Sequence, residues 1–178
     1  MQRRWMLGLG ANLGDARGAL ERTLTRLRQH SDLQVIAVSS LWRSAPVDAE
    51  GPDFLNAVLA IDTALAPQAM LMLAQSLESE EGRVRPHRNA PRTLDVDLLL
   101  AGSLVLDTPL LTLPHPRMHQ RAFVLAPLLE IDPLAQIPRL GGAADWASAC
   151  AGQRIEKLGP LADIAGEAPC AGHSGSVQ

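Results

Sequence analysis

The chain has 178 residues, a net charge of −3, 47% apolar residues and 20% charged residues. This length favours one domain with its own core, and the composition is ordinary for a globular protein. The slight negative charge argues against a chain that attracts nucleic acid or an anionic membrane as a whole, so an anion site must be a local cluster of arginines. Two cysteines without metal-ligand spacing, and an initial apolar run too short for a signal peptide, lead us to expect a cytoplasmic protein.

Strand and helix patterns alternate along the first hundred residues. The predicted elements are, in order, a strand at 4–10, a helix from Asp15 to about His30, strands at 33–41 and 54–63, a helix from Pro67 to about Gly82 and a strand at 93–100. This β-α-β-β-α-β order predicts an α+β, ferredoxin-like core.

The remainder of the chain predicts additional short elements around that core. We expect short strands at 103–107 and 110–113, a helix at 120–129 broken by Pro127, and a weak helix at 143–158. Residues 1–160 are expected to form a single domain. Residues 161–178 are rich in Gly, Ala and Ser, and we expect a disordered tail there.

The strongest chemical signal is the pair Asp95 and Asp97 in the last predicted strand. Side chains alternate across a strand, so the two carboxylates share one face, while Leu94, Val96 and Leu98 occupy the other. Two such acids repel each other unless a cation lies between them, and Mg²⁺ often binds one or two carboxylates together with substrate phosphates. A solvated polar face is the alternative, which the apolar run after Asp97 disfavours.

Four arginines precede this pair in a short segment that contains two prolines: Arg83, Arg85, Arg88 and Arg92. Guanidinium groups match phosphate oxygens bidentately, so acids, metal and arginines can together neutralise a polyphosphate. Surface Arg–Asp pairing is the alternative, but it gives no reason for the prolines that keep this segment out of a helix. We interpret the segment as a mobile phosphate-binding lid.

Two further groups are weaker signals on their own. His115 lies between two prolines and suits a phosphate donor or an acid–base role, although a solvated turn histidine is the commoner case. Phe54 and Asn56 share a strand face, which gives a stacking surface beside an amide edge, as a planar heterocycle requires. A core Phe and a capping Asn are the alternative. Phe54 and Phe123 are the only phenylalanines, and there is no tyrosine.

The motifs GLGANLGD, PDFLNAV, EEGRVR, APRTLDVDLL and LPHPRMHQRAF, in this order, resemble the 6-hydroxymethyl-7,8-dihydropterin pyrophosphokinase family of folate biosynthesis. The resemblance extends from about Met6 to Leu158. It implies transfer of an intact pyrophosphoryl unit from ATP to the pterin hydroxymethyl group with release of AMP, and a monomer is expected. Asn89 stands where the family often has an aromatic residue.

The resemblance also implies roles for individual residues. Asp95 and Asp97 would bind two Mg²⁺ ions, with ATP as co-substrate. Phe54 and Phe123 would sandwich the pterin and Asn56 would bind its edge, while Ser44, Ala45, Pro46 and Val47 would meet its far side. The polyphosphate would contact Arg83, Arg85 and Arg92. The ATP pocket would be lined by Glu78, Leu98, Thr112 and His115, with Arg121 at the reacting end.

Three other functions remain open from the residues alone. A ligand-sensing module would explain the element order but not the acids beside four arginines. An RNA-binding sheet would need more aromatic residues and a basic balance. Another metal-dependent kinase or nucleotidyltransferase would differ in whether AMP, ADP or pyrophosphate is released.

Overall fold

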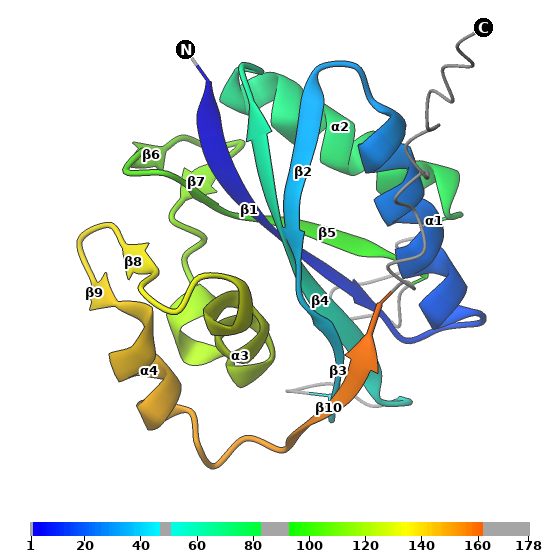
Figure 1. The fold of residues 1–178 in the computed structure, drawn as a ribbon, viewed down its shortest axis with the longest axis vertical. Coiled ribbons are helices and arrows are strands. Elements are labelled where there is room, and N and C mark those ends of the chain that lie inside the picture. Colours follow the sequence, from blue (N-terminus) through cyan, green and yellow to red (C-terminus); the bar gives the residue numbers. More distant parts are fainter. Residues whose placement is uncertain (1, 47–50, 83–92, 162–178) are drawn as a thin grey trace, which may run out of the picture.

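The computed structural model describes residues 2–46, 51–82 and 93–161 of the chain. A mostly antiparallel β-sheet forms the centre of the protein (Figure 1). The sheet order is β10-β3-β4-β1-β5, with β2 also pairing with β4. Its strands are β1 (Arg3–Ala11), β2 (Leu33–Val38), β3 (Ser40–Ser44), β4 (Phe54–Thr63), β5 (Asp95–Ala101) and β10 (Ile155–Pro160). Two small hairpins lie outside it: β6 (Leu106–Asp107) with β7 (Thr112–Leu113), and β8 (Gln136–Ile137) with β9 (Gly141–Gly142).

The described residues form four α-helices, two on each side of the sheet (Figure 1). They are α1 (Ala16–Gln29), α2 (Pro67–Glu80), α3 (Ala122–Ile131) and α4 (Ala143–Ala149), with a short 3₁₀ turn at Met118–Gln120 before α3. On one face of the sheet, Leu20, Leu24 and Leu27 of α1 pack together with α2 residues against Leu7, Leu59 and Val96. We call this cluster the first core. On the other face α3 packs against Val58, Ala60 and Leu99.

The predicted fold class is confirmed. Strand β1 lies between β4 and β5, and β4 lies between β1 and the β2–β3 segment, so each helical crossover encloses one other strand, as the split β-α-β pattern requires. Asp15 caps α1 as predicted, because its Oδ1 accepts a hydrogen bond from the Gly18 amide at 3.0 Å.

The predicted strand at 33–41 is in fact two strands separated at Ser39. The Ser39 amide bonds Val58 O and the Ser39 hydroxyl accepts from the Val58 amide, each at 2.9 Å. Ser39 pairs with Val58, and Trp42 pairs with Asn56. From the first pair to the second, β4 advances by two residues and the facing segment by three, so the facing segment contains one extra residue, a β-bulge. Bulges redirect the side chains that follow them, which sets the face occupied by β3.

Two predictions in the last third of the chain are wrong. The helix expected at 143–158 ends at Ala149, and residues 155–160 instead form β10, which pairs antiparallel with β3. Gly159 at φ +110° suits no helix, and the edge of β3 offers backbone hydrogen bonds. Pro127 does not break α3, since it lies buried within a helix whose apolar neighbours pack on the sheet.

The extra strands are present but shorter than predicted, as β6 and β7. Leu161 is buried with the first core, one residue beyond the predicted domain end. The tail at 162–178 lies outside the described residues. No helix among the described segments is long and apolar enough to cross a bilayer.

Candidate active site

Asp95 and Asp97 lie on one face of β5, as the sequence predicted, and β5 forms an edge of the sheet. Their neighbours Leu94, Val96 and Leu98 are buried in the first core on the opposite face. Alternation thus places apolar groups under α2 and both carboxylates on the face that α3 covers. Both acids remain partly accessible, with 31% of the Asp97 side chain exposed.

Two glycines of β1 form the surface beside this acid pair. In the strand register, Gly10 is opposite Asp95 and Gly8 is opposite Asp97. On its other side Gly10 is opposite Asn56 of β4. A Cβ added at Gly10 would meet Asn56 Oδ1 at 3.5 Å, an ordinary contact, so packing alone does not require glycine there. Both glycines lie within the strand predicted at 4–10, and their alternate spacing, which places them on one face of that strand, is the signal that sequence reasoning missed.

His115 and Arg121 bring hydrogen-bond donors to Asp97. His115 Nε2 lies 3.9 Å from Asp97 Oδ1, and Arg121 Nη1 lies 3.6 Å from Asp97 Oδ2. The His115 amide bonds Leu99 O at 2.9 Å, which fixes the histidine beside β5. Its Nδ1 accepts from the Arg117 amide at 3.2 Å, so the neutral ring carries its proton on Nε2, towards the acid.

Burial keeps this imidazole neutral. Desolvation, followed by the nearby charges of Arg121 and Arg117, lowers the pKa of His115 to about 4, against a smaller opposite effect of Asp95. At neutral pH His115 is therefore an uncharged donor rather than a cation. The peptide bond Leu113–Pro114, just before it, is cis.

A pocket of about 290 Å³ runs along the β5 edge between α2 and the 108–116 segment. It brings together the residues predicted to line an ATP site, namely Glu78, Leu98, Thr112 and His115, and it includes both aspartates. Glu78 is buried, and its Oε1 accepts the Val96 amide at 2.9 Å, so this carboxylate also caps the edge strand. Sequence spacing alone did not predict that contact.

The predicted ring-binding residues lie on the α3 face of the sheet. Asn56 is buried; its Nδ2 donates to Ser44 Oγ at 3.0 Å and approaches Trp42 O and Phe54 O at 3.4 Å. Ser44 is opposite Phe54 across β3 and β4. Phe123 is half-buried at the start of α3, with the Arg121 guanidinium 5.5 Å from its ring centre.

Several predicted residues cannot be placed. Val47 and the arginines Arg83, Arg85, Arg88 and Arg92 lie outside the described residues, as does Asn89. The last described residues before the arginines form an ion-pair cluster that the sequence analysis missed. Glu81 accepts from Arg22 Nη2 and Arg26 Nη1, each at 2.8 Å, and these contacts tie α1 to the end of α2.

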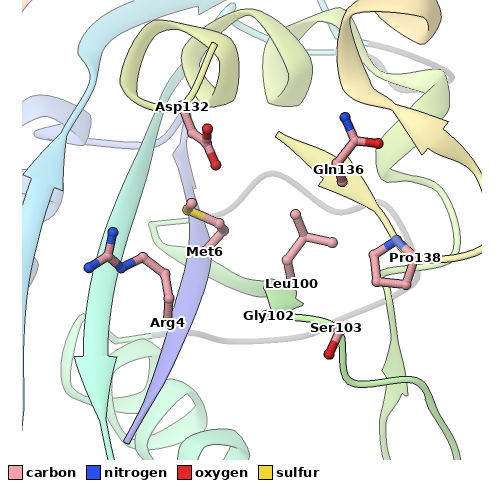
Figure 2. Close-up of a pocket in the computed structure, with 8 residues that line it drawn as sticks. All are labelled: Arg4, Met6, Leu100, Gly102, Ser103, Asp132, Gln136 and Pro138. Atoms are coloured by element: carbon pink, nitrogen blue, oxygen red, sulfur yellow. The ribbon is translucent and has the colours of Figure 1, made fainter. Parts of the chain in front are cut away.

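A second hollow lies at the opposite end of the same face (Figure 2). Met6 and Leu100 form its apolar floor, and Arg4 lies across it from Gln136 and Pro138. Its volume is about 430 Å³, larger than the edge pocket, yet it contains none of the predicted site residues. We therefore place the candidate active site at the β5 edge. No group of three or more His, Cys, Asp or Glu side chains gathers within the described segments, so a cation here would need ligands from a substrate.

The fold and the acid pair beside donor side chains define an enzyme of the phosphotransferase class. The sequence profile of 7,8-dihydro-6-hydroxymethylpterin-pyrophosphokinase (HPPK) matches residues 6–133. The 2-amino-4-hydroxy-6-hydroxymethyldihydropteridine pyrophosphokinase of Pseudomonas aeruginosa is 40% identical over 159 residues, 89% of this chain and 98% of the relative. That of Bacillus subtilis is 44% identical over 126 residues, 70% and 75% of the two chains.

Solved structures show the same fold. HPPK-DHPS A437G of Plasmodium falciparum with SDX-DHP superposes with a TM-score of 0.67 at 14% identity, covering 84% of this chain. The match spans 45% of the Plasmodium chain, so this protein corresponds to under half of that length. The chain belongs to the HPPK family. Its reaction is pyrophosphoryl transfer from ATP to 6-hydroxymethyl-7,8-dihydropterin in folate biosynthesis, EC 2.7.6.3.

Proposed function

We propose that the reaction takes place over Asp95 and Asp97, with Mg²⁺ held between these carboxylates and the ATP phosphates. One observation carries the proposal: the two acids lie where the edge pocket meets the glycine surface of β1. A nucleotide in the pocket and a flat acceptor over Gly10 would therefore meet at the same pair of carboxylates.

The residues fit such a cation. Mg²⁺ prefers oxygen ligands and commonly takes one or two carboxylates, with phosphates and water completing its shell. Gly10 carries no side chain opposite Asp95, and an added Cβ there would meet only Asn56 Oδ1 within 4 Å, which leaves space for the remaining ligands; over Gly8 the Leu99 side chain fills the corresponding position. Mg²⁺ bound there would neutralise phosphate charge and polarise the phosphoryl oxygens. By resemblance we propose two such ions.

On the ATP side, the chain's residues orient the nucleotide along β5. Leu98 and Thr112 line the pocket, and the contact of Glu78 with the Val96 amide keeps the pocket wall in register. His115 presents a neutral Nε2–H beside Asp97, suited to a phosphate oxygen. We assign Arg83, Arg85 and Arg92 to the polyphosphate from the sequence resemblance.

On the acceptor side, Phe54 and Phe123 would stack on the two faces of the pterin, and Asn56 would bind its edge. Because Asn56 Nδ2 already has partners at Ser44, its Oδ1 is the atom available to accept a ring N–H. Pro46 and Val47, together with Ser44, would bound the far side. The hydroxymethyl arm would then point along β1 towards Asp97.

In the transfer step, the pterin hydroxyl oxygen forms a bond to the β-phosphorus of ATP. The bond from that phosphorus to the oxygen bridging the α-phosphate breaks, AMP leaves with the bond's electrons, and the hydroxyl proton passes to water. The chain contributes alignment and charge: Arg121 faces the reacting end and His115 donates from the same side.

We also propose a single domain that includes residues 1–160 and the buried Leu161, acting as a monomer in the cytoplasm. The net charge of −3 gives no reason to expect a nucleic-acid or membrane partner.

The test compares Asp97→Asn with Asp132→Asn, the same chemical change in the second hollow on the same face. We expect AMP formation from ATP, Mg²⁺ and 6-hydroxymethyl-7,8-dihydropterin to fall by roughly a hundredfold or more in Asp97→Asn, because charge stabilisation of the transferring group is lost. Asp132→Asn should match wild type. Equal turnover in both variants would refute the assignment of Asp97.

A further inference from the structure

A cluster of hydrogen bonds and one ion pair joins α3 to β3 and β10, at the end of the sheet farthest from the aspartates. Glu130, in the last turn of α3, has a side chain that is 25% exposed. Its Oε1 accepts from the Ser40 hydroxyl at 2.6 Å and the Ser40 amide at 3.2 Å, and Lys157 Nζ lies 3.1 Å from the same oxygen. Its Oε2 accepts from Trp42 Nε1 at 3.0 Å. We call Glu130, Ser40, Trp42 and Lys157 the Glu130 clamp.

The stability of α3 by itself does not explain why a glutamate stands at position 130. A carboxylate in the last turn of a helix opposes the helix dipole, so Glu130 is unfavourable for α3 alone. Burial also disfavours its charge, yet hydrogen bonds from Ser40 and Trp42, with Lys157, hold the pKa of Glu130 below its ordinary value. The charged form is thus stabilised by contacts to two strands, β3 and β10, rather than by its own helix.

The strand register connects this clamp with the candidate active site. Lys157 is opposite Trp42, Trp42 opposite Asn56, Asn56 opposite Gly10, and Gly10 opposite Asp95; this sequence of partners forms one row across five strands. The clamp lies at the β10 end of the row and Asp95 at the β5 end. Asn56 is therefore the direct neighbour of a residue that Glu130 holds, and its Nδ2 also approaches Trp42 O.

The helix completes the connection. Phe123 and Glu130 are seven residues apart on α3, nearly two helical turns, so they project from the same side of the helix. The contacts of Glu130 with Ser40 and Trp42 tie the end of α3 to β3, so a movement of the helix at Glu130 also moves Phe123. Figure 1 shows α3 lying against this face of the sheet, on the side opposite α1 and α2.

We propose that Glu130 is a positioning residue for the acceptor site, which sets the separation of Phe123 from Phe54 and Asn56 through Trp42 and Lys157. This inference rests on the proposed function, because it takes those three residues as the pterin site. It extends that site to β10, a strand beyond residue 133, where the family profile ends.

The test measures KM for 6-hydroxymethyl-7,8-dihydropterin, KM for ATP and kcat in Glu130→Ala, Glu130→Gln and Trp42→Phe. We expect Glu130→Ala to raise the pterin KM roughly ten- to a hundredfold, because small misplacements of binding groups have effects of this size, while the ATP KM stays within about twofold. Glu130→Gln and Trp42→Phe should each give a smaller rise. Trp42→Phe removes only the Nε1 contact to Glu130, which Glu130→Ala already lacks, so the double variant Glu130→Ala/Trp42→Phe should raise the pterin KM no further than Glu130→Ala alone.

The matched control is Glu156→Gln, which removes another carboxylate of the same strand pair. Glu156 pairs with Arg43, one register position from Lys157 and Trp42, but both side chains of this pair are exposed. This variant should leave both KM values unchanged. All assays are run at least 15 °C below each variant's melting midpoint, so that unfolding does not alter the kinetics; if Glu130→Ala does not fold, Trp42→Phe and Lys157→Met take its place.

A purely structural role predicts a lower melting midpoint with unchanged KM values, and that result would overturn the proposal. A parallel rise of both KM values would overturn it as well. Phe123→Ala separates this failure from failure of the acceptor site itself. If Phe123→Ala raises the pterin KM and the Glu130 variants do not, only the positioning role is wrong; if none of them raises it, the pterin site is wrong.

Discussion

Replacing Gly10 by alanine separates stability from substrate binding. Gly10 lies in the central strand β1, partly exposed, between Asn56 and Asp95. An added Cβ would be 3.5 Å from Asn56 Oδ1, an ordinary contact, and Gly10 is not among the glycines with positive φ. The folded protein therefore accepts alanine without strain.

The magnitudes follow from this geometry. Alanine in a strand is favoured over glycine by about 0.5–1 kcal/mol through chain entropy. For a domain of this size that raises the melting midpoint by about 1–4 °C. The methyl group would occupy the surface on which the pterin is proposed to lie, and overpacking costs about 1–3 kcal/mol. The pterin Kd should then rise by roughly 5- to 150-fold.

The assay is calorimetric titration of 6-hydroxymethyl-7,8-dihydropterin in the presence of a non-hydrolysable ATP analogue, together with a thermal melt. Gly152→Ala is the control, because a Cβ there meets no atom within 4 Å and Gly152 lies outside the strands of the sheet. We expect Gly10→Ala to melt at or above the wild-type temperature and to bind pterin weakly. Wild-type pterin affinity in Gly10→Ala would refute the idea that this glycine surface carries the ring.

Two further predictions concern protonation. Hydrogen bonds from Arg22, and then from Arg26, hold the pKa of Glu81 below its ordinary value against desolvation. The charged Glu81 therefore adds to the free energy of unfolding above about pH 4.5, and this stabilisation is lost as the pH falls through the lowered pKa. Glu81→Gln should therefore lower the free energy of unfolding by about 1–2 kcal/mol at pH 7, allowing for partly exposed arginines. The difference between variant and wild type, measured by chemical denaturation, should be smaller at about pH 3. The same difference at both pH values would contradict this role of Glu81. Because the pKa of His115 is about 4, kcat/KM should show no limb from this ring between about pH 5.5 and 8. A limb near pH 6.5 that disappears in His115→Gln would contradict that expectation.

The sequence predicted most of what positions the acid pair, because the relevant signals are local. Alternation around Asp95 and Asp97 requires only that the segment be a strand, and the apolar run after Asp97 indicated one. The cap at Asp15 and the start of α2 at Pro67 are likewise decided by neighbouring residues.

Predictions failed where distant pairing decides the structure. Residues 155–160 have no strong pattern of their own and become a strand because β3 offers an open edge. The bulge at Ser39 depends on its two hydrogen bonds to Val58, which no local pattern announces. The neighbours of Asn56 and the clamp at Glu130 depend on register between distant strands, so they appear only in the folded structure.

Direct counting of bound metal is the sharpest test of the acid pair. Mn²⁺, an EPR-visible substitute for Mg²⁺, would be titrated into wild type, Asp95→Ala and Asp97→Ala with α,β-methylene ATP present, and free Mn²⁺ read from its spectrum. If Asp95 and Asp97 hold the cations, wild type binds two Mn²⁺ per chain and each variant binds fewer or binds at least tenfold more weakly. The same Mn²⁺ stoichiometry and affinity in all three proteins would contradict the assignment of Asp95 and Asp97 as the metal ligands.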